Sequence, residues 1–215
     1  KTAFKPALLR GMDLARAEVK AIAEQMSAST FDNTILAFED SGRPLARASI
    51  LFRVYTSTMN DKEMQKIEAD MSPLLAGFDD EVTQNEALFA RIKAIHDVRA
   101  LSNLDPVQRR LIEVHYNRLA RQGAALDQDK KARLKEINGT LASLFATFSQ
   151  NVLADENEGQ LVIADAADLA GLPESVRAGA AQVAESRGKK GQWVIANTRP
   201  SVEPFLTYPE RRDSR

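Results

Sequence analysis

The sequence contains no cysteine and only two histidines in 215 residues. Without cysteine the chain can form neither disulfides nor thiolate metal sites, and it has no cysteine nucleophile. This absence fits a reducing bacterial cytoplasm, where we expect the protein, and it fits a cysteine-poor periplasm as well. No apolar run approaches the roughly 20 residues of a membrane-spanning helix. The net charge of −1 gives no attraction to nucleic acid or to an anionic membrane, so we expect neither as a partner.

The first 60 residues have the periodicity and the punctuation of helices. Apolar residues at helical spacing predict a helix over 5–26. The stretch FDNTILAFEDSG (31–42) predicts a second helix with Asp32 as its N-cap. Because Gly42 and Pro44 interrupt but do not clearly end this pattern, the favoured interpretation is one long helix that is kinked near Pro44.

Further helix starts follow at regular intervals. Asn60 has capping-box spacing to Glu63, and a helix is predicted over 85–101. Asp105-Pro106-Val107-Gln108 is the clearest start signal, for a helix that stops near Gly123. Methionines and phenylalanines at helical spacing predict core positions: Met64, Met71, Phe78, Phe145 and Phe148.

The longest periodic run predicts a helix that packs inside a bundle. Its apolar residues alternate spacings of three and four, as in a coiled coil, and the run is too short for a coiled coil on its own. The residues are Leu134, Ile137, Leu141, Leu144, Phe148 and Val152.

After residue 157 the pattern changes to short β-rich runs. Strands are predicted at 160–164 and 192–196, with a helix over 174–186 between them. The sequence therefore predicts a mainly α fold with a small β element near residues 160–196. We expect a helical bundle region over 1–157 and a mixed region over 158–215. The charged ending without a helix cap, and the start at Lys1 without Met, suggest that the chain is part of something longer.

A search for chemistry finds no catalytic centre. His96 with Asp97, or His115 with Glu113, could contribute to a metal site across two helices, but no third ligand is visible for a zinc site. A histidine at a helix surface or interhelical seam is the simpler interpretation. Asn138-Gly139-Thr140 matches a glycosylation signal inside a predicted helix.

The acidic runs and the glycine-flanked lysines also have simpler explanations than catalysis. FEDSG, GFDDE and LADENEG are interpreted as solvated faces and caps. GKKG (188–191) lacks the spacing of a phosphate loop and is interpreted as a turn before the strand at 192–196. No nucleophile elbow or dinucleotide fingerprint is present.

Several phrases, in this order and spacing, are nevertheless distinctive. They are TFDNTILAFEDSGRPLARA (30–48), MQKIEADMSPLLAGFDDEVTQNEALFARIKAIHD (64–97), QRRLIEVHYNRLARQGAAL (108–126), FSQNVL (148–153) and LAGLPESV (169–176). Together they resemble the N-terminal region of the thimet-oligopeptidase-like family of zinc metallopeptidases, and within it the bacterial peptidyl-dipeptidases. The resemblance extends from about Phe4 to Arg215.

The resemblance implies a part in an enzyme that cleaves short unstructured peptides and releases C-terminal dipeptides. The family's His-Glu-x-x-His zinc motif and its substrate-positioning residues lie in a C-terminal region with no counterpart here. We therefore expect no catalytic, cofactor-binding or metal-binding residue in 1–215, zinc only in the longer enzyme, and no activity from this chain alone. The missing catalytic region is an expected partner, and an exposed apolar face is expected to support dimerisation. The alternative is a free-standing helical scaffold or interaction domain without catalysis.

Overall fold

The computed structural model describes residues 1–210. Contacts divide the chain into two compact units, Lys1–Ala146 and a second unit that begins at Thr147. The predicted mainly α fold is confirmed. In chain order the elements are α1 (Phe4–Ala23), a π-helical turn η1 (Phe31–Leu36), α2 (Ala37–Asp40), α3 (Arg43–Thr58), α4 (Lys62–Thr83), α5 (Glu86–Val98), α6 (Pro106–Arg121), α7 (Gln128–Glu158), β1 (Gln160–Ile163), a 3₁₀ turn η2 (Ala166–Leu169), α8 (Glu174–Ser186), β2 (Trp193–Ala196) and α9 (Arg199–Thr207).

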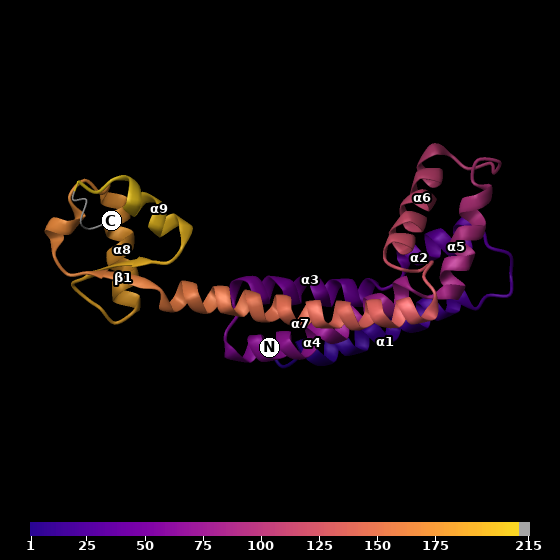
Figure 1. Cartoon of the computed structure of the whole chain (residues 1–215), viewed down its shortest axis with the longest axis horizontal. Coiled ribbons are helices and arrows are strands. Elements are labelled where there is room, and N and C mark those ends of the chain that lie inside the picture. Colours follow the sequence, from indigo (N-terminus) through magenta and orange to yellow (C-terminus); the bar gives the residue numbers. More distant parts are fainter. Residues whose placement is uncertain (211–215) are drawn as a thin grey trace. The chain divides into compact units, whose positions relative to one another are not determined.

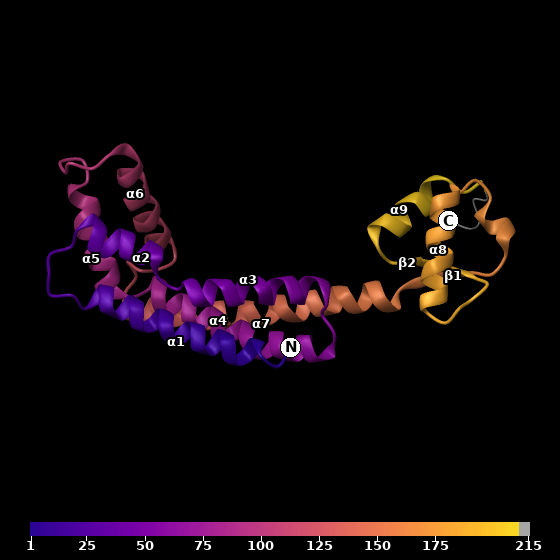
Figure 2. The same cartoon turned by 180° about the vertical axis from the view of Figure 1, so that it is seen from behind.

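The first unit is built on three helices that lie side by side. Figures 1 and 2 show α1, α3 and α4 running along one another. Gly11 of α1 permits a close approach to α3, since a Cβ atom at this position would lie 2.8 Å from Leu45 Cα. Apolar side chains fill the interior between the three helices, which confirms the core positions predicted for two of the methionines: Leu8, Met12, Phe52, Met64 and Met71.

A second core in this unit lies where α1 and η1 meet α5 and α6. α5 packs on α6, and η1 contacts both of these helices. The buried residues come from all of these elements, so this core depends on pairing of segments distant in sequence: Val19, Ile22, Ile35, Phe38, Leu88, Ile92, Ile95, Ile112, Leu119 and Ala124.

The helix start at FDNTI is capped two residues earlier than the sequence predicts. The N-cap is Thr30, whose hydroxyl accepts a hydrogen bond from the backbone N–H of Asn33 at 3.1 Å. The Asn33 side chain completes the capping box by accepting from the Thr30 backbone N–H at 2.9 Å. Asp32 as N-cap is therefore wrong. The box uses an asparagine where the usual pattern has Glu or Gln, which hid it in the sequence.

A buried arginine from α5 stabilises this capped turn from the other side. Arg91 is 8% exposed. Its Nη1 donates to the carbonyl oxygens of Gln25 at 3.1 Å and Ser27 at 2.9 Å, and its Nη2 donates to Asn33 Oδ1 at 3.1 Å. One guanidinium thus satisfies carbonyl groups in the segment between α1 and η1, where no helical hydrogen bonds are available.

The predicted single kinked helix is two helices in the structure. α2 ends at Asp40, and Gly42 takes a left-handed conformation with φ of 72°. A left-handed residue breaks the helical path outright, and Pro44 then occupies the first turn of α3, where its missing N–H costs nothing. The glycine therefore ends one helix and the proline begins the next.

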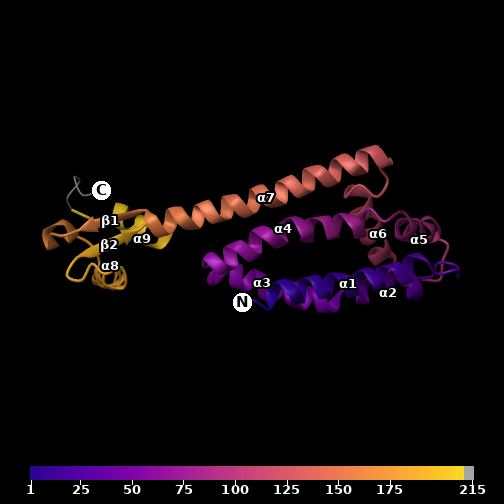
Figure 3. The same ribbon diagram turned by 90° about the horizontal axis from the view of Figure 1, so that it is seen from below.

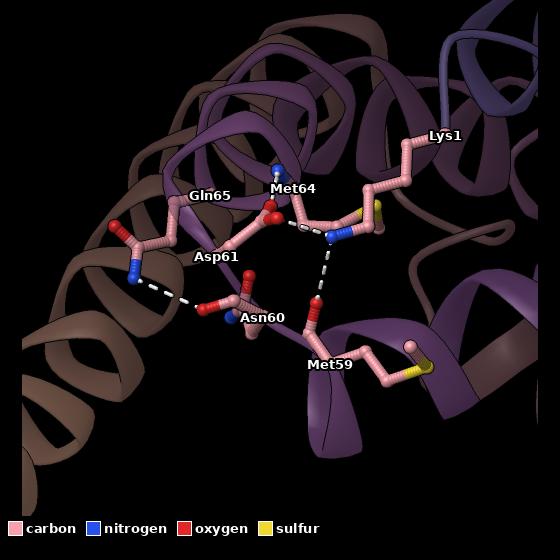
Figure 4. A network of polar contacts seen from close by, with 6 residues as sticks. All are labelled: Lys1, Met59, Asn60, Asp61, Met64 and Gln65. Carbon is pink, nitrogen blue, oxygen red and sulfur yellow. Dashed lines mark hydrogen bonds and ion pairs between the residues drawn. The ribbon is translucent and has the colours of Figure 1, made fainter.

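At the turn between α3 and α4, Asp61 is the N-cap in place of the predicted Asn60. Asp61 Oδ1 accepts from the Met64 backbone N–H at 3.1 Å, and its carboxylate also pairs with the Lys1 ammonium (Figure 4). The same ammonium donates to the Met59 carbonyl at 3.3 Å. Asn60 contributes its own carbonyl, which accepts from Gln65 Nε2 at 3.3 Å. The choice between adjacent cap residues depends here on the distant N-terminal lysine.

Other start signals are confirmed. Asp105 caps α6 with a full capping box to Gln108, and Pro106 is the first helical residue. The helix predicted at 174–186 is α8, and the two predicted strands are β1 and β2. The strands pair antiparallel, with Gln160 opposite Ala196 and Ile163 opposite Trp193.

The second unit packs α8 and α9 against β2, as Figure 2 shows. It has a small buried core of its own: Ile163, Leu169, Leu172, Ala180, Ile195 and Phe205. The GKKG segment forms a turn before β2, as predicted, with positive φ at Gly188 and Gly191.

The periodic run on α7 does not pack inside a bundle. Figure 3 shows α7 lying beyond α4, outside the group formed by α1, α3 and α4. Leu134 is half-buried, but the other side chains of the run are exposed, and the core positions predicted for Phe145 and Phe148 are wrong. Exposed fractions are 39% for Ile137, 42% for Leu141, 59% for Leu144, 67% for Phe145, 66% for Phe148 and 43% for Val152.

The Thr30–Asn33–Arg91 arrangement gives a sharp stability test. Replacing Asn33 with Ala removes the reciprocal cap and one acceptor of a buried guanidinium, so the free energy of unfolding should fall by about 2–4 kcal/mol. Asp32→Ala, at the exposed neighbouring position, is the matched control and should change it by less than about 1 kcal/mol. Urea unfolding followed by circular dichroism measures both. Equal losses in the two variants would contradict the assignment of the cap.

Candidate functional site

His115 is the one histidine that the structure buries, and its ring faces α2. It lies on α6 and is 4% exposed. Its Nε2 atom is 2.6 Å from Glu39 Oε1, but neither Nε2 nor Nδ1 makes a hydrogen bond of acceptable geometry with the described residues. The centroid of the His115 ring is 5.4 Å from that of the Phe38 ring. The guanidinium of Arg118 lies over the same Phe38 ring, 5.7 Å from its centroid.

A cavity of about 250 Å³ opens beside His115. Its polar groups are Glu39, Ser41, His115 and Arg118, and the remainder of its lining is mainly apolar side chains of α1, α3 and α4. The residues of FEDSG therefore do more than cover a solvated helix end, because four of the five line this cavity.

Burial lowers the pKa of His115, against the opposing effect of the Glu39 carboxylate, which raises it. Desolvation is the larger effect, so the neutral imidazole is favoured in the fold. A neutral imidazole beside a carboxylate can accept or relay a proton. The cavity brings no hydroxyl nucleophile into a hydrogen bond with this ring, so the geometry alone does not define a reaction.

His96 belongs to a different environment. Its ring stacks on Tyr116 with centroids 3.8 Å apart, and its Nδ1 lies 3.4 Å from Asp97 Oδ1. Glu113 pairs instead with Arg110 at 2.8 Å. Since Tyr116 and His115 are adjacent on a helix, the two histidines point in different directions. The structure does not combine them into the two-helix metal site considered from the sequence. Across residues 1–210, no cluster of three or more potential metal ligands occurs.

One residue of the acidic runs is buried, contrary to the prediction that these runs are solvated, whereas its neighbours Asp79 and Glu81 are exposed. Asp80, in GFDDE, is 5% exposed. Its Oδ1 accepts from Gln84 Nε2 at 3.0 Å and from Asn138 Nδ2 at 2.6 Å. Burial raises the pKa of the neighbouring Asp79, with Arg118 acting in the opposite direction. Of these two partners of Asp80, only Gln84 is close enough in sequence, four residues away, to be expected from helical spacing. Asn138 is 58 residues away, so its contact could not be predicted from neighbouring residues.

Polar contacts join the first turn of α7 to α5. Glu86 Oε1 accepts from Gln128 Nε2 at 2.7 Å and pairs with Lys131 Nζ at 3.0 Å. Beyond Asn138 the same helix presents the exposed apolar residues described above. Within the described chain, no helix is both long enough and apolar enough to cross a bilayer.

Comparison with known proteins shows that the chain is similar to part of a peptidase. No family model matches the chain. Dipeptidyl carboxypeptidase from Escherichia coli K12 is 36% identical over 212 residues, which is 99% of this chain and 31% of the relative. The chain is related to the thimet-oligopeptidase-like zinc metallopeptidases. The resemblance carried by its ordered phrases is thereby confirmed.

Two less similar relatives are oligopeptidases. Oligopeptidase A from Haemophilus influenzae is 31% identical over 183 residues, covering 85% of this chain and 27% of the relative. Organellar oligopeptidase A from Arabidopsis thaliana is 28% identical over 156 residues, covering 70% of the chain and 20% of the relative. The chain thus spans less than a third of the length of the curated relatives it matches.

His115 makes stability depend on pH in a defined direction. Its pKa is lower in the fold than in the unfolded chain, where it is about 6.5. The unfolded state therefore binds the proton first, and the stability that depends on neutral His115 is present above about pH 6.5 and falls as the pH drops through the folded pKa.

Urea unfolding between about pH 7 and 5 should show a steeper loss for the wild-type chain than for His115→Gln, which cannot titrate in this range. His96→Gln removes the other histidine and should keep the wild-type slope, because His115 remains. If His115→Gln and the wild type lost stability in parallel, burial of a neutral imidazole would not be the cause.

Proposed function

We propose that this chain forms part of the helical wall of a zinc oligopeptidase that cleaves short unstructured peptides and releases C-terminal dipeptides. The observation that carries the proposal is the 36% identity to a dipeptidyl carboxypeptidase along 99% of the chain. The wall acts as a steric filter: it limits access to substrates that can enter a narrow channel. Its residues take no part in bond cleavage.

The chemistry of the proposed enzyme comes from a region outside these 215 residues. The sequence has no His-Glu-x-x-His motif, which places two imidazoles one helical turn apart for zinc. In the longer enzyme, zinc would lower the pKa of a bound water and so supply the nucleophile for peptide hydrolysis. The residues of this chain supply neither the metal ligands nor the base.

The two regions have different proposed roles. Residues 1–157 form the helical wall, and residues 158–215 begin a larger mixed domain. The small core of β1, β2, α8 and α9 supports the second assignment, since it is separate from the cores of the first unit. We place the enzyme in the bacterial cytoplasm, with which the absence of cysteine is compatible; a periplasmic location is the alternative.

The α7 surface is proposed as the contact for the catalytic region. Exposed contiguous apolar surface is unusual on a protein that acts alone and indicates an interaction site. Four exposed side chains of α7 within the first unit supply that surface: Ile137, Leu141, Leu144 and Phe145. When the catalytic region is absent, two copies of the chain would cover the same surface by dimerising.

A free-standing helical scaffold without catalysis is the second candidate function. The buried guanidinium of Arg91 and the buried ammonium of Lys131 both have partners within the first unit, and this favours a wall that folds by itself. A scaffold requires no catalytic region elsewhere in the same polypeptide, so the gene distinguishes the two candidates.

Activity tests the main proposal directly. The 215-residue chain, with added zinc, should leave a short blocked peptide uncleaved, because it lacks the metal ligands. The full product of the reading frame that encodes it should release C-terminal dipeptides and should stop doing so when zinc is chelated. A stop codon directly after Arg215, or a longer frame without His-Glu-x-x-His, would support the scaffold instead.

Association of the chain tests the α7 surface. Phe145→Glu places a charge in the apolar surface and should convert a dimer to a monomer in light scattering, with helical content unchanged. Ser143→Glu, an exposed position on the opposite side of the same helix, is the matched control and should leave the dimer intact. A wild-type chain that is monomeric at high concentration would contradict the dimer.

A further inference from the structure

The exposed face of α6, within the first unit, carries a surface groove of about 630 Å³. The groove lies mainly on residues spaced three or four apart, which share one side of a helix. The buried residues Ile112, His115 and Leu119 point into the core from a different side of α6. The groove therefore lies on the part of α6 that the described chain leaves open to solvent.

Two arginines make one end of this groove positively charged. Arg118 and Arg121 both line it, and both are exposed. Because they are three residues apart on a helix, their Cβ atoms lie about 5–6 Å from each other, and both guanidiniums can bind the same carboxylate. Among the described residues neither arginine has a hydrogen bond or an ion pair. Arg118 lies over the Phe38 ring and interacts with Asp79 only electrostatically.

An apolar side chain and a further arginine continue the groove toward the start of α6. Val114 is 44% exposed and lies four residues before Arg118, and Arg110 lies four residues before Val114. Arg110 pairs with Glu113 at 2.8 Å, but both side chains are exposed, and an exposed ion pair of this kind is weak. A guanidinium has five N–H donors, so Arg110 can also donate to the carboxylate of a ligand.

The order of these side chains matches one face of an extended peptide. Arg118 follows Arg110 by eight residues, which is about 12 Å along the helix axis, and Val114 lies midway. In an extended strand every second side chain points to the same face, and residues i and i+4 are about 13 Å apart. A peptide with acidic residues at i and i+4 and an apolar residue at i+2 therefore has the same spacing of groups as the groove.

We propose that the groove on α6 binds a separate short acidic peptide in extended conformation. One acidic side chain of the peptide binds Arg118 and Arg121 together. An apolar residue two positions away packs on Val114, and a second acidic residue, four positions away, binds Arg110. The charges favour an acidic ligand, because three arginines and one glutamate line the groove. The inference goes beyond the proposed peptidase function and does not depend on it, since the surface proposed for the catalytic region is on α7.

Two blocked pentapeptides of identical composition test this register. In acetyl-Glu-Ser-Leu-Ser-Glu-amide the carboxylates and the leucine share one face of the strand, whereas in acetyl-Ser-Glu-Leu-Glu-Ser-amide they lie on opposite faces. Titration of each peptide into the 215-residue chain at low ionic strength, followed by the NMR shifts of the backbone amides of Val114, Asn117 and Gln122, measures both affinities. The first peptide should bind about fivefold more tightly. Raising the salt concentration from about 20 to about 200 mM should weaken its binding severalfold, because exposed charges make the contacts.

Variants assign the contacts. Arg121→Gln removes one guanidinium at an exposed position, so it should fold as the wild type does and should weaken binding of the first peptide about threefold to fivefold. Arg10→Gln makes the same change of charge at an exposed position of α1, and as the matched control it should bind as the wild type does. Glu113→Gln frees Arg110 and removes the carboxylate that repels an acidic ligand, so this variant should bind the first peptide more tightly than the wild type.

Equal affinity for the two peptides, or unchanged affinity in Arg121→Gln, would overturn the proposal. So would a single-stranded oligonucleotide that competes for the groove as well as the first peptide does, because general binding of anions by arginine would then explain the site. The longer product of the reading frame gives the last test. If it failed to bind the first peptide while the 215-residue chain bound it, the remainder of the longer protein would cover the groove, and the groove would not be a site for a separate peptide.

Discussion

The buried guanidinium of Arg91 is the interaction on which the first unit depends. It reaches from α5 into the segment between α1 and η1 and bonds two backbone carbonyls and the Asn33 side chain. A buried charge of this kind is stable only when its donors are paired. The Arg91 contacts fix the position of η1, and η1 in turn places Phe38 and Glu39 against α6. The cavity beside His115 is a consequence of how α5 holds a distant loop.

Local chemistry was sufficient to predict most of the helices. Asp105, Pro106 and Gln108 act within four residues of one another, and the α6 start was predicted from them without error. The two strands and α8 were also predicted, because turn residues enclose them. In these segments the signal and the structure it specifies occupy the same short stretch of chain.

The errors arose where a distant residue decides between local alternatives. Thr30 and Asp32 are both acceptable caps, and Arg91 favours the box built on Asn33. Asn60 and Asp61 are both acceptable as well, and Lys1 pairs with the second. Asp80 looked like part of a solvated acidic run until α7 brought Asn138 to it. No pattern within a window of neighbouring residues contains this information, so the candidate sites could be predicted only as residue types.

The periodic run of α7 gave a correct helix and a wrong environment. Spacing specifies which side chains share a face, but it does not specify what lies against that face. Under the function proposed above, this exposed face is the contact for a catalytic region outside the 215 residues.

The contact at Gly11 has a consequence for the outer surface of α3. Because α1 and α3 approach closely enough that a Cβ atom at Gly11 would lie 2.8 Å from Leu45 Cα, α3 cannot rotate about its own axis without separating from α1. The side of α3 opposite Leu45 is thereby fixed outward, with Ile50, Leu51 and Val54 each more than half exposed. A hydrogen atom in place of a side chain on one helix thus determines which apolar residues of its neighbour remain in contact with water.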